Sequence, residues 1–172
     1  MGYVTTVLQS VLASAEMAHN HWVLLAYRLP REPSTPRITL WRRLRRLGVA
    51  QVADGVVALP LDARTREQLE WLADEIVAND GNASIWLSEP GTAAQERDLA
   101  AQMRAAVTAE YRALIEEAHR TAGEREGSRR RTLARLRREL RRIHSRDYFP
   151  ESIAADARAA VETLASSLEA VR

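Results

Sequence analysis

Three features of this 172-residue sequence predict an α+β fold. Short apolar runs alternate with amphipathic segments over residues 21–90, in the order strand, helix, hairpin, helix, strand. The pair Asp54-Gly55 separates two of these runs, which is a strong hairpin signal. From about residue 92 onward the apolar spacing is entirely helical. The prediction is a βαββαβ core followed by a C-terminal helical extension of about three helices.

The first strand and the first helix flank a proline-rich loop. Residues 21–30, HWVLLAYRLP, form a continuous apolar run whose length suits a buried strand. Three prolines at positions 30, 33 and 36 then predict the loop. An amphipathic helix follows and ends at Gly48, since glycine is favoured just past a helix. Its predicted core face contains Leu40, Trp41, Leu44 and Leu47.

The second half of the core repeats this order. Residues 49–53 and 56–59 are the two arms of the hairpin. Asp62 is placed to cap a helix that ends near Asp80-Gly81, and residues 83–87 form the last strand. The predicted core face of this helix contains Leu69, Leu72, Ala73 and Ile76. This order of elements is that of the ferredoxin-like arrangement, with two helices on one face of an antiparallel sheet.

We predict that the chain is divided into three regions. Residues 1–20 form an N-terminal extension with weak helical spacing over 4–15, residues 21–90 form the core, and residues 91–172 form a helical extension packed on the core. We expect a helix over 92–118, an arginine-rich helix capped by Ser128, and a last helix after Pro150. The apolar face of that last helix contains Ile153, Ala157, Val161, Leu164 and Leu168.

Composition excludes several classes of protein. There is no cysteine, which excludes disulfides and thiolate metal sites. No apolar run approaches the ~20 residues that span a bilayer, and the first residues lack the basic start of a secretory signal. We therefore expect a cytoplasmic protein with no membrane association. No glycine-rich phosphate loop, HExxH or GxSxG motif is present, so we predict no enzyme, no cofactor, no catalytic residue and no metal site.

The segment SRRRTLARLRRELRRIHSRDYFP, residues 128–150, is the candidate functional region. Over 128–149 it has nine arginines and two acidic residues, for a net charge of +7. At 100° per residue its apolar side chains form one stripe, so this helix packs against another element. The stripe contains Leu133, Leu136, Leu140 and Ile143, and the opposite side contains Arg131, Arg135, Arg138, Arg142 and Arg146.

Two interpretations of these arginines remain open. Arg131, Arg135 and Arg138, with Arg142, repeat along one side of a rod, and guanidinium groups match phosphate oxygens, which predicts binding of nucleic acid or an oxyanion. This interpretation expects no interleaved acid on that face, with Glu139 lying off its centre. Alternatively the helix is a solvated surface, or pairs with the acidic helix 62–80 at about 0–1 kcal/mol per ion pair. Arg42 and Arg46 join the candidate site if both basic helices share a face.

The chain resembles the amino-terminal domain of the chromate resistance regulator ChrB. The resemblance begins at WVLLAYRLP and LWRRLRRLGVAQVADGVVALP, within residues 22–60, and continues through EQLEWLADEIVANDGNASIW and LARLRRELRRIHSRDYFP. It implies a cytoplasmic protein that regulates, or responds to, chromate and is linked to transcription. Longer members of that family carry a second, C-terminal domain, and chemistry housed there is not transferred to these residues.

The same block is more distantly similar to PaaX-type regulators and to ferredoxin-like CRISPR-associated nucleases. In those nucleases the first strand ends in a metal-binding aspartate, whereas the matching residue here is Arg28. Because an arginine repels a cation, the nuclease interpretation is rejected.

The leading hypothesis is a non-enzymatic regulator of chromate resistance that binds nucleic acid by backbone electrostatics. Its proposed contacts are Arg131, Arg135, Arg138 and Arg142, helped by Arg42 and Arg46. One alternative is a dimerisation or docking module, whose edge strand or Trp71 surface meets a partner, such as a second copy in a homodimer. Another is direct binding of a small oxyanion such as chromate by the same arginines.

Overall fold

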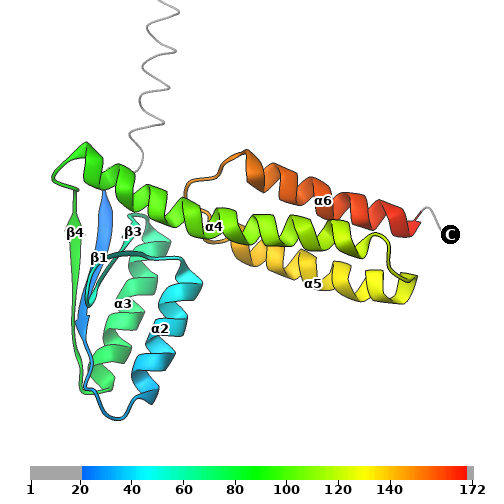
Figure 1. Ribbon diagram of the computed structural model, residues 1–172. Coiled ribbons are helices and arrows are strands. Elements are labelled where there is room, and N and C mark those ends of the chain that lie inside the picture. Colours follow the sequence, from blue (N-terminus) through cyan, green and yellow to red (C-terminus); the bar gives the residue numbers. More distant parts are fainter. Residues whose placement is uncertain (1–20, 170–172) are drawn as a thin grey trace, which may run out of the picture. The chain divides into compact units, whose positions relative to one another are not determined.

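An antiparallel four-stranded sheet with two helices forms the first of two units in the computed structural model, which describes residues 21–169 (Figure 1). The described part of this unit consists of residues 21–45 and 49–99, and the second unit consists of 46–48 with 100–169. The predicted helix over residues 4–15 lies outside the described residues. The elements of the first unit are β1 Trp22–Arg28, α2 Thr35–Leu47, β2 Ala50–Ala53, β3 Val56–Pro60, α3 Ala63–Ala78 and β4 Asn82–Ser88.

The α+β class and the predicted order of elements are confirmed. The strands lie in the order β2-β3-β1-β4, and all neighbours are antiparallel. At the centre of the sheet, Leu25 of β1 pairs with Val57 of β3 on one side and with Ile85 of β4 on the other. Both connections that pass through a helix skip one strand, so β1 and β3 become the central strands and β2 and β4 the edges.

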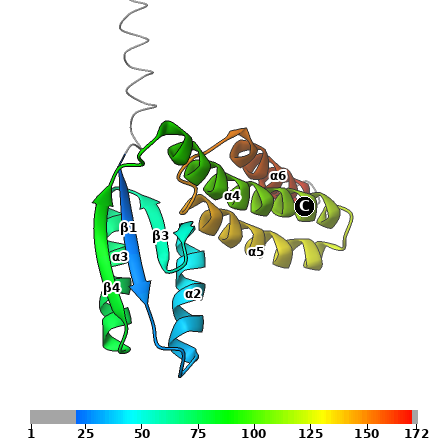
Figure 2. The same ribbon diagram turned by 60° about the vertical axis from the view of Figure 1, so that its left-hand side comes forward.

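Helices α2 and α3 cover the same face of the sheet (Figures 1 and 2). The core contains Val23 and Leu25 of β1, which have no exposed surface, together with apolar side chains of both helices. The prediction that Trp41 belongs to this core is wrong, because its side chain is 56% exposed. Only Leu40 and Leu44 of α2 are buried, since a single i, i+4 pair is enough to seat this short helix.

Asp62 caps α3 as predicted. Its carboxylate accepts a hydrogen bond from the Thr65 N–H at 2.7 Å, and the Thr65 hydroxyl oxygen accepts one from the Asp62 N–H at 3.0 Å. The buried Thr65 hydroxyl also donates to the Pro60 carbonyl oxygen at 2.7 Å. This reciprocal cap joins the end of β3 to the start of α3 and satisfies N–H groups that a helix leaves unpaired.

The β2–β3 turn requires glycine at position 55. Gly55 has a φ of 71°, in the left-handed region that other residues rarely adopt. Its carbonyl oxygen accepts a hydrogen bond from the Tyr27 N–H at 2.7 Å, which ties the turn to the end of β1. A Cβ atom at position 55 would lie 2.5 Å from the Tyr27 carbonyl oxygen, which is closer than real Cβ contacts.

The second unit is built from three helices that lie side by side (Figures 1 and 2). Its apolar core includes Val107, Tyr111, Leu136, Ile143 and Leu164, and the predicted apolar faces of the last two helices are largely buried in it. Ser128 was predicted to cap the arginine-rich helix, and this is wrong: the helix begins two residues earlier, and the Ser128 hydroxyl donates to Glu124. The helices are α4 Ala93–Thr121, α5 Glu126–His144 and α6 Ser152–Glu169.

Tyr111 of α4 is buried beside Asp147. Its hydroxyl donates a hydrogen bond to the Asp147 carboxylate at 3.2 Å. Burial raises the pKa of Tyr111 to about 12, and the negative charge of Asp147 contributes to the rise.

None of the helices in the described residues is long and apolar enough to cross a membrane.

Replacing Gly55 by alanine should lower the free energy of unfolding by about 1–3 kcal/mol, because the new Cβ clashes with backbone at a left-handed position. Gly127 is the matched control: it lies in the first turn of α5 with open space around it. G127A should leave the stability unchanged or raise it. Urea unfolding followed by circular dichroism measures both, and equal stability of G55A and the native protein would contradict the role of the turn.

Alkaline pH should destabilise the protein through Tyr111. The folded-state pKa of about 12 lies above the ordinary value of 10.0, so the buried hydroxyl stabilises the fold fully below pH 10 and loses this contribution as pH rises towards 12. Tyr111→Phe should cost about 1 kcal/mol at pH 8, by loss of the hydrogen bond. Between pH 10 and 12 the variant should lose less stability than the native protein. Parallel losses in urea titrations across that range would rule out this assignment.

Candidate nucleic-acid interface

Helix α5 is anchored by its apolar stripe. Leu136 and Ile143 have no exposed surface, Leu133 is buried and Leu140 is partly buried among the helices of the second unit. Because an α-helix is a rigid rod, burying one side determines the direction of every other side chain on it. The four arginines predicted to bind a polyanion consequently point outward, and each is exposed: Arg131, Arg135, Arg138 and Arg142.

Acidic side chains of α4 neutralise one edge of the predicted row. Arg135 forms an ion pair with Glu117, and Arg142 lies 3.8 Å from Glu110. Glu110 and Glu117 are seven residues apart, as are Arg135 and Arg142, so these contacts between α4 and α5 repeat every two helical turns. We call these two contacts the α4–α5 ladder. Arg146, the last member of the row, also pairs with Glu110, and its side chain is only 12% exposed.

Glu139 is also part of this edge. Its carboxylate lies 3.4 Å from Arg135 and 3.2 Å from Arg142. The expectation that no acid lies along this face is therefore wrong, because Glu139 sits one helical turn from each arginine. In the second unit, the acids that contact Arg135, Arg142 and Arg146 come from α4 and α5. The sequence contained the seven-residue spacing of the α4 acids but did not indicate which face of α4 lies along α5.

Four exposed arginines remain on the other flank of α5. Within residues 21–169, no ion pair or hydrogen bond joins their guanidinium groups to another residue. Two of them, Arg131 and Arg138, belong to the predicted row, and the other two lie beside them at the edge of the apolar stripe. On a helical wheel they share an arc of about 120° that begins about 20° from Arg142 and extends away from the α4–α5 ladder. We call this group the open arginines: Arg131, Arg137, Arg138 and Arg141.

Arg42 and Arg46 of α2 are exposed, and both already make interactions within the chain. Their neighbour Arg43 forms an ion pair with Glu75 of α3. Arg42 belongs to the first unit and Arg46 to the second. That the two basic helices share one binding face stays a prediction.

The open arginines provide positive charge on one flank of α5. In the described part of the chain, no three histidine or acidic side chains gather in a way that could hold a metal ion. A row of unpaired guanidinium groups can bind phosphate oxygens by charge and by paired N–H donors.

Comparisons with known proteins match about half of the sequence to one family. A family model described as "Protein ChrB, N-terminal" matches residues 37–126, which is just over half of the chain and includes Arg42 and Arg46. The open arginines lie beyond this matched segment. Protein ChrB of Cupriavidus metallidurans is 32% identical over 95 residues, which cover 55% of this chain and 26% of that protein. The matched residues thus span about a quarter of this relative's length.

A solved structure shares the fold. An uncharacterised protein from Mycobacterium tuberculosis aligns with 98% of this chain and 72% of its own, with a TM-score of 0.50 and 16% sequence identity. At that identity the likeness concerns the fold alone.

Proposed function

The chain belongs to the family of ChrB amino-terminal domains, and from this premise we propose that it is a non-enzymatic, cytoplasmic regulator of chromate resistance that binds nucleic acid. The open arginines are the observation that carries the nucleic-acid part of the proposal. They are four exposed cations that the described residues leave without a carboxylate partner. Unrelieved like charges on one helix cost stability, and a polyanion would relieve them.

The expected mode of binding is contact with phosphates and not reading of bases. The open arginines lie within one arc of a single helix, so they can follow the phosphates of one nucleic-acid strand. The paired members of the predicted row, Arg135 and Arg142, are less available, because each must give up a carboxylate before it can bind a phosphate. We therefore place the interface at Arg131 and Arg138 with their flank neighbours, and assign Arg135 and Arg142 to a supporting role.

Salt dependence of DNA binding tests this mode. If four arginines each neutralise one phosphate, the logarithm of the binding constant should fall with the logarithm of salt concentration with a slope of about −3.6. Replacing Arg131 and Arg138 by glutamine should reduce this slope to about −1.8. Fluorescence anisotropy of a labelled DNA duplex, measured at several salt concentrations, gives the slope directly.

The matched control is R43Q/R66Q, which removes the same charge from two arginines already paired with Glu75 and Glu70. This variant should keep the native slope. A native slope in R131Q/R138Q, or an equal change in the control, would show that binding follows net charge and not the open arginines.

A second candidate function is self-association through β4. This strand is an edge of the sheet, and its sequence NASIWLS has no charged residue and no proline to discourage pairing with another chain. Trp86 and Leu87 on it are 61% and 55% exposed. A second copy is the partner that such a strand suits, because two uncharged edges can pair antiparallel about a two-fold axis.

Replacing Trp86 by lysine should weaken or abolish such a dimer, because it removes an exposed apolar side chain and adds a charge to each pairing edge. Val52 on the opposite edge strand, which is 46% exposed, provides the control V52K, which should leave the dimer intact. Light scattering at increasing concentration measures the mass. A monomer at every concentration would remove this candidate.

Direct binding of chromate by the predicted arginines, Arg131, Arg135, Arg138 and Arg142, stays a further prediction. It differs from the first proposal in its ligand: chromate, but not sulfate at equal ionic strength, should then displace DNA from the native protein and change the salt slope.

A further inference from the structure

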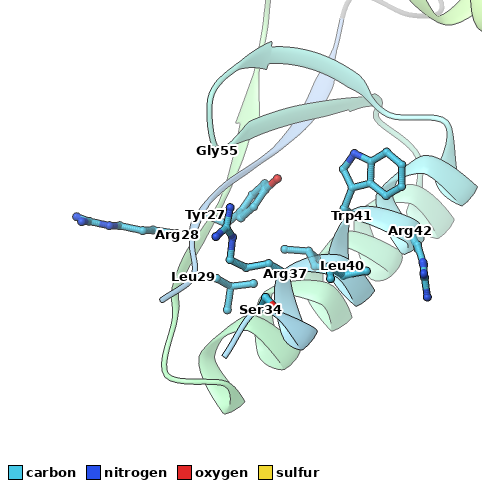
Figure 3. A pocket seen from close by; sticks show the side chains of 10 residues that line it. Tyr27, Arg28, Leu29, Ser34, Arg37, Leu40, Trp41, Arg42 and Gly55 are labelled. Carbon is cyan, nitrogen blue, oxygen red and sulfur yellow. The ribbon is translucent and has the colours of Figure 1, made fainter. Parts of the chain in front are cut away.

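A pocket of about 620 Å³ opens in the sheet unit, between the end of β1, the first turns of α2 and the β2–β3 turn (Figure 3). This volume lies in the range of small-molecule sites. Its lining includes Tyr27, Leu29, Ile38, Leu40 and Trp41, and none of its lining residues is acidic. The pocket therefore combines apolar walls with a positive electrostatic character.

Its two aromatic walls are held in place by separate contacts. The Tyr27 backbone is tied to the hairpin turn through the hydrogen bond to Gly55. Trp41 stands on α2 with the guanidinium of Arg45 placed 5.0 Å from its ring centroid, a typical cation–π arrangement. The contact with Arg45 restrains the Trp41 ring, so this ring has less conformational freedom to lose when a ligand packs against it.

Arg37 supplies the cation. Figure 3 shows its side chain running from α2 towards Tyr27, whereas Arg28 and Arg42 point away from the pocket. Among the residues that the structure describes, Arg37 has no ion pair or hydrogen bond. The first turn of α2 also lacks an acidic residue that could compete for it. An unpaired guanidinium beside apolar walls favours an anion with an apolar body.

The Tyr27 hydroxyl can add one hydrogen bond. It makes none with other residues of the described chain. The ordinary pKa of tyrosine already keeps this hydroxyl protonated at neutral pH, and partial burial raises the pKa of Tyr27 further, so the hydroxyl can donate to an anionic oxygen.

We propose that this pocket binds a small aromatic carboxylate, with the ring packed between Tyr27 and Trp41 and the carboxylate paired to Arg37. An inorganic oxyanion would pair with Arg37 but leave the aromatic walls in contact with water. A neutral aromatic molecule would cover the walls but take the guanidinium out of water without a partner, which is costly. A cation is repelled. The assignment uses no residue of α5 and does not depend on nucleic-acid binding.

Isothermal titration calorimetry with 2-naphthoate tests the pocket in the full chain, with 2-naphthamide as the neutral analogue. The native protein should bind 2-naphthoate and bind the amide at least 10-fold more weakly, since a charge-assisted hydrogen bond is lost. R37Q should weaken 2-naphthoate binding by roughly 10- to 100-fold and leave the amide unaffected. W41A should weaken both ligands, because it removes a wall and not the charge.

R31Q is the matched control: Arg31 is an exposed arginine of the same loop that lines a neighbouring pocket and not this one. It should bind 2-naphthoate like the native protein, and thermal melting should show that all variants are folded. Three results would each overturn the proposal. The first is that native protein gives no heat of binding with 2-naphthoate, and the second is that R31Q and R37Q lose equal affinity for it. The third is that chromate displaces 2-naphthoate and that W41A binds chromate as tightly as the native protein does. The last result would identify an inorganic oxyanion site.

Discussion

Burial of the apolar stripe of α5 is the constraint on which the candidate interface depends. Leu136 and Ile143 have no exposed surface, and they hold the helix in one rotation about its axis. This rotation determines which neighbouring elements each arginine of α5 faces. Arg129 lies at the same angle as the stripe, so it is half-buried and its guanidinium donates to the Ser167 side chain of α6. The stripe thus decides which arginines pair within the protein and which remain exposed.

The α4–α5 ladder divides the positive charge of α5 between two roles. On the side facing α4, carboxylates form ion pairs with Arg135 and Arg142. Exposed pairs of this kind contribute only about 0–1 kcal/mol each, so the buried stripe, and not the ladder, determines the orientation of α5. On the other flank Arg130 pairs with Glu126, whereas the four open arginines have no such partner among the described residues, so their charge remains available for steering an anion.

The same logic applies to α2 in the sheet unit. Leu40 and Leu44 are buried, which places Arg37, Trp41 and Arg45 in a row four residues apart along one flank. The sequence places Trp41 on the same helical face as Leu40, Leu44 and Leu47, which predicts a core position, because large apolar residues on such a face are usually buried. The hairpin turn at Gly55 completes a pocket with this flank; the sequence predicts the turn itself, but no local pattern predicts that it lies across a pocket from α2.

The sequence by itself determined the order of elements, the hairpin at Asp54-Gly55, the cap at Asp62 and the apolar faces of α3, α5 and α6. These depend on periodicity and on backbone preferences of single residues, which act over a few positions. Only the tertiary structure decided which arginines of α5 are paired, because Glu110 and Glu117 come from another helix whose facing side no local rule specifies. The charge of each residue can be read from the sequence, but whether an opposite charge neutralises it depends on the distance between elements that are far apart in the chain.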